Sequence, residues 1–226
     1  ARVVISPPDL PDEGASAGPA EDLMNGGLTD DGHYTDLVLA NADLLSQSAA
    51  HVSIQSARFQ DVRLASSQLK WLTLTDALLN HCDVANADWR QSTLNRIELI
   101  DCRMTGINLV DSKIRNTSFN ECKMDFAVFR SAVFKDCRFS ACDLRDADFA
   151  QSDLQGVIFR NCDLRGLQFF GTNLQGADLR GSKLDGLQAR AGDLRGAVID
   201  SLQMIAVARQ FADLLGITVS DDHVSN

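Results

Sequence analysis

The chain has 226 residues, of which 45% are hydrophobic and only 6% aromatic, enough for one domain whose core is built from small and aliphatic side chains. No stretch approaches the ~20 apolar residues that span a membrane. The first residues also lack the apolar stretch of a signal peptide, so we expect a cytoplasmic protein. The net charge of −10 is unevenly distributed: residues 1–36 carry eight acidic residues against one arginine, whereas residues 37–204 carry 20 acidic and 19 basic residues.

Residues 1–36 have the composition of an extended acidic arm. They contain all four prolines (Pro7, Pro8, Pro11 and Pro19) and most of the acidic excess, a composition that favours order only where the arm docks. Tyr34 continues the register of the repeats that follow. We therefore expect the last third of the arm to cap the first coil, as the ends of a solenoid require, and the proline-rich first half to be mobile. A disordered tail is the alternative.

Residues 37–204 repeat with a period of five. Every fifth residue from Leu39 to Met204 is apolar, and the residue two places before each of them is small or apolar, Gln47 being the one bulky polar exception. This period matches neither a helix nor a flat strand. It indicates a chain that turns a corner every five residues and stacks on itself, with one large and one small side chain of each unit pointing inward.

Like residues recur at intervals of twenty. Five of the six cysteines have this spacing (Cys82, Cys102, Cys122, Cys142 and Cys162), and so do Phe119, Phe139 and Phe159. Twenty residues divided into units of five predict a coil with four sides, and residues 37–204 are enough for about eight such coils. From Gly156 onward glycine occupies many corners, whereas earlier corners carry Asn, Asp, Ser or bulkier residues. This difference predicts different turns in the two halves.

The units Ala42-Asp43-Leu44, Ala147-Asp148-Phe149 and Ala177-Asp178-Leu179-Arg180-Gly181 resemble the A(D/N)LXX unit of pentapeptide-repeat proteins. The resemblance covers about three quarters of the chain. It implies an all-β solenoid, namely a right-handed quadrilateral parallel β-helix of about eight coils. The repeat encodes a shape, so it implies function much less directly than fold.

Residues 205–226 form a third region, an amphipathic helix and tail, and the helical pattern begins just after Ile199. Asp200 is the expected N-cap, with Gln203 three residues later, and Gly216 is the expected C-cap. The segment resembles the C-terminal end of the quinolone-resistance, gyrase-interacting members of the family, where a comparable segment joins two rods. This implies a homodimer. We predict that its interface is the apolar stripe Met204, Val207, Ala208, Phe211, Leu214 and Leu215.

The residues give no sign of catalysis, a cofactor or a metal. The four histidines share no spacing that would gather a triad or a metal site. All six cysteines fall in the small inward register, so we expect reduced, buried thiols. A near-match to a phosphate-binding loop at residues 176–183 has its lysine one place late and is generated by the repeat itself.

These features predict a non-catalytic protein that acts through protein–protein interaction. The most specific hypothesis is a mimic of DNA that binds a type II topoisomerase, DNA gyrase, and protects it from inhibitors. The nearly neutral charge of the repeats weakens this version, because a DNA mimic should present rows of carboxylates. The alternative is a structural or scaffolding protein without topoisomerase contact. The arginines form no basic stripe, so we expect no direct binding to nucleic acid, and none to membranes.

Overall fold

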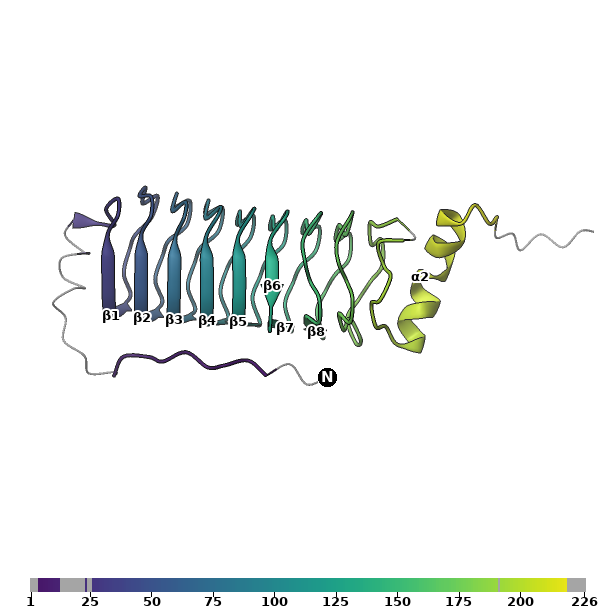
Figure 1. Cartoon of the computed structure of the whole chain (residues 1–226), viewed down its shortest axis with the longest axis horizontal. Helices are drawn as coiled ribbons and strands as arrows, with labels where there is room; N and C mark the ends of the chain where they lie inside the picture. Colours follow the sequence, from purple (N-terminus) through teal and green to yellow (C-terminus); the bar gives the residue numbers. More distant parts are fainter. Residues whose placement is uncertain (1–3, 13–22, 24–25, 191, 219–226) are drawn as a thin grey trace, which may run out of the picture.

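The computed structural model describes residues 4–12, 23, 26–190 and 192–218, and the chain forms one long column with a helix at its C-terminal end (Figure 1). The strands and the helix are β1 (His33–Ala40), β2 (Ser53–Gln60), β3 (Thr73–Asn80), β4 (Thr93–Ile100), β5 (Lys113–Asn120), β6 (Val133–Lys135), β7 (Arg138–Ser140), β8 (Ile158–Arg160) and α2 (Ser201–Leu214). In the described part of the chain, no helix is long and apolar enough to cross a membrane.

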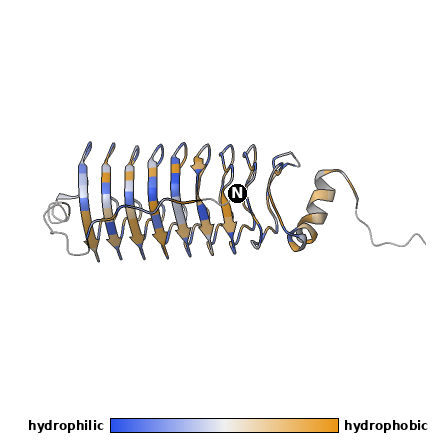
Figure 2. Ribbon diagram, turned by 60° about the horizontal axis from the view of Figure 1, so that its bottom comes forward, coloured by the Kyte–Doolittle hydropathy of each residue, from blue (hydrophilic) through white to orange (hydrophobic). Residues whose placement is uncertain are grey.

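The column is a right-handed quadrilateral parallel β-helix, as the repeats predict. All strand pairs are parallel, and the register is twenty residues from His33↔Ser53 to the bridge Asp178↔Val198. Each coil therefore hydrogen-bonds to the coils before and after it. In β1, β3 and β4 the second half of the strand is more hydrophobic than the first half, so two neighbouring sides of the column differ chemically along these coils (Figure 2).

Both inward registers are buried and fill the column. Phe119, Phe139 and Phe159 stack coil on coil, with ring centroids 4.5 Å and 4.8 Å apart. Trp89, the largest inward side chain, satisfies its indole by donating from Nε1 to Oγ of the buried Ser67 at 2.9 Å. All six cysteines are free and buried, as their register predicts.

The corners share one backbone conformation throughout the repeats. The angle φ is positive at every fifth residue from Asp31 to Gly186, whatever the side chain. The two halves of the column are expected to have different turns, but their corners do not differ in φ. Trp71 and Phe126, both with a φ of 58°, adopt the same left-handed conformation as the later glycines. The halves do differ at one corner of the coil. The strands β1 to β5 pass through this corner without interruption. In later coils a hydrogen-bonded turn forms there, for example with the Val157 N–H donating to the Leu154 carbonyl.

The N-terminal end of the column is capped. Leu23 and Leu28 are buried and join the core, and Tyr34 packs against it. This cap explains the polar residue Gln47 in the small inward register. Its side-chain oxygen accepts a hydrogen bond from the Leu28 N–H at 3.0 Å.

Residues 4–12, in the proline-rich segment that we expect to be mobile, lie along the side of the column (Figure 1). Arg58 Nε donates to the Pro11 carbonyl at 2.8 Å, and Pro11 is buried. Composition alone gave no sign of this docking, because it depends on groups that the coils place side by side.

Candidate interaction surfaces

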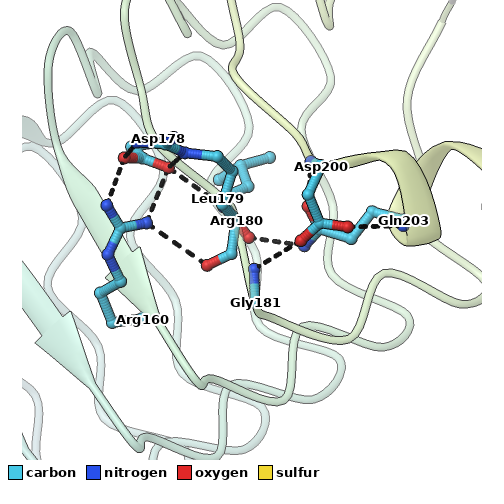
Figure 3. Close-up of polar contacts among 7 residues, drawn as sticks. All are labelled: Arg160, Asp178, Leu179, Arg180, Gly181, Asp200 and Gln203. Atoms are coloured by element: carbon cyan, nitrogen blue, oxygen red, sulfur yellow. Dashed lines mark hydrogen bonds and ion pairs between the residues drawn. The ribbon is translucent and has the colours of Figure 1, made fainter.

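The junction between the last coil and α2 is built by two polar residues. Asp200 N–H donates to Gln203 Oε1 at 2.8 Å, and Gln203 N–H donates to Asp200 Oδ1 at 2.9 Å. This reciprocal pair is the predicted capping box, and it satisfies two N–H groups that a helix start would leave free. The other carboxylate oxygen of Asp200 accepts a hydrogen bond from the Gly181 N–H, which ties the helix to the preceding coil (Figure 3).

Gln203 also closes the open edge of the column. Its Nε2 donates to the carbonyl oxygens of Leu179 and Ser182, both at 2.6 Å, and the side chain is buried. A parallel edge presents unpaired backbone groups to which another chain could add. The Gln203 amide occupies the Ser182 carbonyl and adds a second donor to the Leu179 carbonyl, which also accepts from the Ser182 N–H, so α2 caps the column as well as presenting a surface.

The predicted dimer residues divide between two sides of α2. Val207 is buried and Phe211 is partly buried, and together they cover the last coil at Leu184, Leu187 and Ile199. Met204, Ala208 and Leu215 are exposed instead. Met204 lies on the helix rather than in the last repeat, because α2 begins at Ser201. The side chain of Leu214 lies outside the described part of the structure.

The outward side of α2 carries apolar residues that the helical stripe does not include. Leu202 is 79% exposed and Ile205 is 73% exposed, and Met204 lies between them in the chain. The sequence prediction did not include Leu202 and Ile205, because it considered only the apolar stripe on one side of the helix. Their spacing of three residues, opposite the stripe, is the signal that could have found them.

Within the described residues, ion pairs hold nine arginines on the sides of the column. They join arginines to aspartates within one unit or on the next coil, namely Arg63–Asp43, Arg90–Asp88, Arg96–Asp76, Arg103–Asp83, Arg130–Asp148, Arg145–Asp143, Arg160–Asp178, Arg165–Asp163 and Arg180–Asp178. Asp178 is held by two guanidinium groups (Figure 3). The hydrogen bonds from Arg180 and Arg160 keep the pKa of the Asp178 carboxyl well below its usual range.

The described histidines do not come together. His51 stacks on the exposed ring of Trp71 with centroids 4.7 Å apart, and His81 lies 3.2 Å from a carboxylate oxygen of Asp101. His223 lies outside the described residues. The thiols donate weak hydrogen bonds to backbone carbonyls, as Cys137 does to Ile114, and burial raises the pKa of Cys137 to about 12. Among the described residues, no three His, Cys, Asp or Glu side chains are grouped to hold a metal ion.

The fold thus defines a β-solenoid whose large surfaces are its four sides and its capped ends. Pentapeptide repeats (8 copies) match residues 74–109, and a pentapeptide repeat region matches residues 112–189. The two matches together cover half of the chain, and the chain belongs to the pentapeptide-repeat family. A search of curated protein sequences finds no match.

Several solved structures are similar to this chain. Full-length QnrB1, a plasmid-mediated fluoroquinolone resistance protein, is 20% identical over 82% of this chain and 100% of its own, with a TM-score of 0.40. HetL from the cyanobacterium Nostoc sp. strain PCC 7120, involved in the regulation of heterocyst differentiation, is 19% identical over 82% of this chain and 97% of its own, with a TM-score of 0.30. A pentapeptide repeat protein of the Arabidopsis thaliana thylakoid lumen is 26% identical over 40% of this chain and 66% of its own, with a TM-score of 0.35.

Proposed function

We propose that the chain is a non-catalytic binding protein, a stiff column recognised by another protein through its sides. The filled interior is the observation that carries this proposal. The hollow inside the N-terminal coils measures only about 20 Å³ and is lined by apolar side chains such as Leu39, Phe59 and Trp89. Such a space cannot hold a substrate, so any partner must be met on the outside, where the side chains are held in straight rows.

The partner that we propose first is a type II topoisomerase, DNA gyrase, bound in place of DNA. A short row of carboxylates supports it: Asp61, Asp101 and Glu121 occupy the same corner on successive coils and are exposed, with His81 between the first two. At the ~4.8 Å spacing of neighbouring strands, Asp61 and Asp101 lie two coils apart and Asp101 and Glu121 one coil apart, which gives a short line of negative charge such as a phosphate backbone presents. The resemblance of the C-terminal segment to gyrase-interacting relatives points to the same partner.

We further propose that two copies join through α2. The predicted interface contains Met204, Val207, Ala208, Phe211, Leu214 and Leu215. Because Val207 and Phe211 pack on the last coil, we place the contact on the outward side of α2. There Leu202 and Ile205 extend the exposed apolar surface of Met204. A second copy related by a two-fold axis would cover the same patch on both chains.

A DNA supercoiling assay with purified gyrase tests the proposed partner. We expect the protein to inhibit supercoiling at micromolar concentration, or to restore it in the presence of a quinolone. The matched variant is Asp61→Asn with Asp101→Asn and Glu121→Gln, which removes the carboxylate row without changing side-chain size. We expect this variant to lose the effect. No effect of the wild-type protein would favour the alternative, a scaffolding protein without topoisomerase contact.

A further inference from the structure

One side of the column contains a hollow with an excess of basic side chains. It lies over the first halves of β3, β4 and β5 and over β6, and measures about 520 Å³. Its lining consists of Thr75, Thr93, Asn95, Arg96, Lys113, Arg115, Asn116, Lys135 and Asp136. Four of these nine residues are cationic and one is a carboxylate, although the chain as a whole has a net charge of −10.

Three of the four cations have no internal counter-charge. Arg96 is held by Asp76 through hydrogen bonds of 2.6 Å. Lys113, Arg115 and Lys135 are exposed, and their side chains make no ion pair or hydrogen bond within the described part of the chain. This is unlike most of the column, where arginines are paired with aspartates.

The register places two of these cations directly opposite each other. Arg115 of β5 and Lys135 of β6 are Cα partners on neighbouring coils, and like charges in this position repel and destabilise a sheet. The residues that flank this pair along the same row are Asn95 and Gln155, which carry no charge. The repulsion is therefore not relieved within the row.

Another like-charged pair shows the contrast. Arg103 and Lys123 also face each other on neighbouring coils. In that row Asp83 pairs with Arg103 at 3.1 Å, and Asp143 is the next partner of Lys123. The row of Arg115 and Lys135 contains no carboxylate to offset the repulsion between its two cations, so it is suited to bind an anion from another molecule.

Beside the hollow, at the corner residue Asp76 and at Arg58 on the neighbouring side, the column already accepts an extended polypeptide, the arm. Asp9 N–H donates to Asp76 Oδ1 at 2.9 Å, and Arg58 donates to the Pro11 carbonyl, so both contacts are made to the main chain of an extended polypeptide. The described arm runs along the column past these strands in both views (Figures 1 and 2). Between Val4 and Pro8 it has no acidic side chain, so this stretch offers the three cations no counter-charge.

We propose that the hollow binds an acidic, extended segment of a partner protein, with carboxylates placed over Lys113, Arg115 and Lys135. The proposal rests on the proposed function of the column as a protein-binding surface, and it names the chemistry of one site on it. Successive side chains on one face of an extended chain are about 6.6 Å apart, and adjacent coils about 4.8 Å, so two or three carboxylates can meet the three cations together. A nucleic acid fits less well, because the hollow offers only three unpaired cations, few for a backbone that carries one charge at every nucleotide.

The test measures binding of a fluorescein-labelled deca-glutamate peptide to the full chain by fluorescence polarisation at low salt. The site variant is Lys113→Gln with Arg115→Gln and Lys135→Gln. The control variant is Lys70→Gln with Lys123→Gln and Arg190→Gln, which changes the net charge equally but on other sides. We expect the site variant to bind roughly tenfold more weakly, as the loss of three exposed charge contacts implies, and the control to stay within about twofold of the wild type.

Three results would overturn the proposal: no binding of the peptide by the wild type, equal weakening in both variants, or full binding by the site variant. Tighter binding of a twenty-nucleotide single-stranded DNA than of the peptide would assign the hollow to nucleic acid instead. The supercoiling assay separates this proposal from the proposed partner. If the protein has no effect on gyrase but still binds the peptide at the hollow, the proposed binding site stands and only the proposed topoisomerase partner is ruled out.

Discussion

Asp200 and Gln203 hydrogen-bond to each other's backbone N–H groups at 2.9 Å and 2.8 Å, and this pair fixes where the β-helix ends and α2 begins. The exchange leaves the Gln203 amide nitrogen free to reach the last coil. A capping box that also closes a sheet edge couples the start of the helix to the end of the column.

Replacing Gln203 by alanine should destabilise the C-terminal end. The Ser182 carbonyl loses its donor, the Leu179 carbonyl keeps only the weaker hydrogen bond from the Ser182 N–H, and the Asp200 N–H loses its acceptor. We expect a loss of about 1–3 kcal/mol in the free energy of unfolding, measured by urea denaturation. The exposed Gln155 provides the control, since its alanine variant should stay within about 0.5 kcal/mol of the wild type. Equal stability of the two variants would contradict the role of Gln203.

Charge on the outward side of α2 should prevent dimer formation. Leu202→Asp with Ile205→Asp places two carboxylates in the proposed contact while leaving Val207 and Phe211 on the last coil. Light scattering at tens of micromolar should give a dimer for the wild type and a monomer for this variant. Phe126→Asp, at a residue that is 59% exposed in the middle of the column, should remain dimeric. A wild type that is already monomeric would remove the proposed interface.

The left-handed corners predict opposite effects of two glycine substitutions. A Cβ added at Gly176 or at Gly192 meets no atom within 4 Å, but only Gly176 has a positive φ, 71°. Gly176→Ala should therefore destabilise the protein by about 1–2 kcal/mol through backbone strain alone. Gly192→Ala should be neutral or slightly stabilising, because it restricts the unfolded chain. Thermal denaturation of the two variants checks this, and a similar melting temperature for both would show that φ is not the cause.

Asp178 should contribute to a loss of stability in acid. Arg180 and Arg160 hold its folded-state pKa below its unfolded value of about 3.9, so the charged carboxylate stabilises the fold above that pH. This stability is lost as the pH falls below about 4 toward the folded-state pKa. Urea denaturation at pH 7 and pH 3 should therefore show a smaller loss for Asp178→Asn than for the wild type. Asp185→Asn, at an exposed carboxylate, should behave like the wild type, and a matching curve for Asp178→Asn would contradict the prediction.

The thiols should react only after unfolding. All six cysteines are buried, which keeps reagents away from them, and burial also raises the pKa of Cys137. The hydrogen bond with Cys142 lowers the pKa of Cys162, so the protection of that thiol rests on its burial alone. Titration with a thiol reagent should label few groups in the native protein and six in denaturant. Rapid labelling of three or more in the native state would show that the column opens readily.

The column itself follows from local repetition. Every unit of five residues makes the same choice of inward and outward side chains, so Leu39, Phe119 and Cys142 could be placed in the core without any knowledge of distant contacts. The side chains at the corners, such as Trp71, give no sign of the backbone conformation that they adopt. The hydrogen bonds between coils impose a left-handed φ there, and this requirement overrides the preference of the side chain.

The capping pair of Asp200 and Gln203 could likewise be predicted, because a capping box is formed by residues that are neighbours in sequence. The tertiary structure alone decided the second role of Gln203, the burial of Val207 against the last coil, the docking of Pro11 beside Arg58, and the gathering of Lys113, Arg115 and Lys135 into one hollow. Each of these depends on groups from separate turns or from the two ends of the chain. A periodic pattern fixes which side chains point outward, but only the stacking of the coils and the path of the ends determine what those side chains meet.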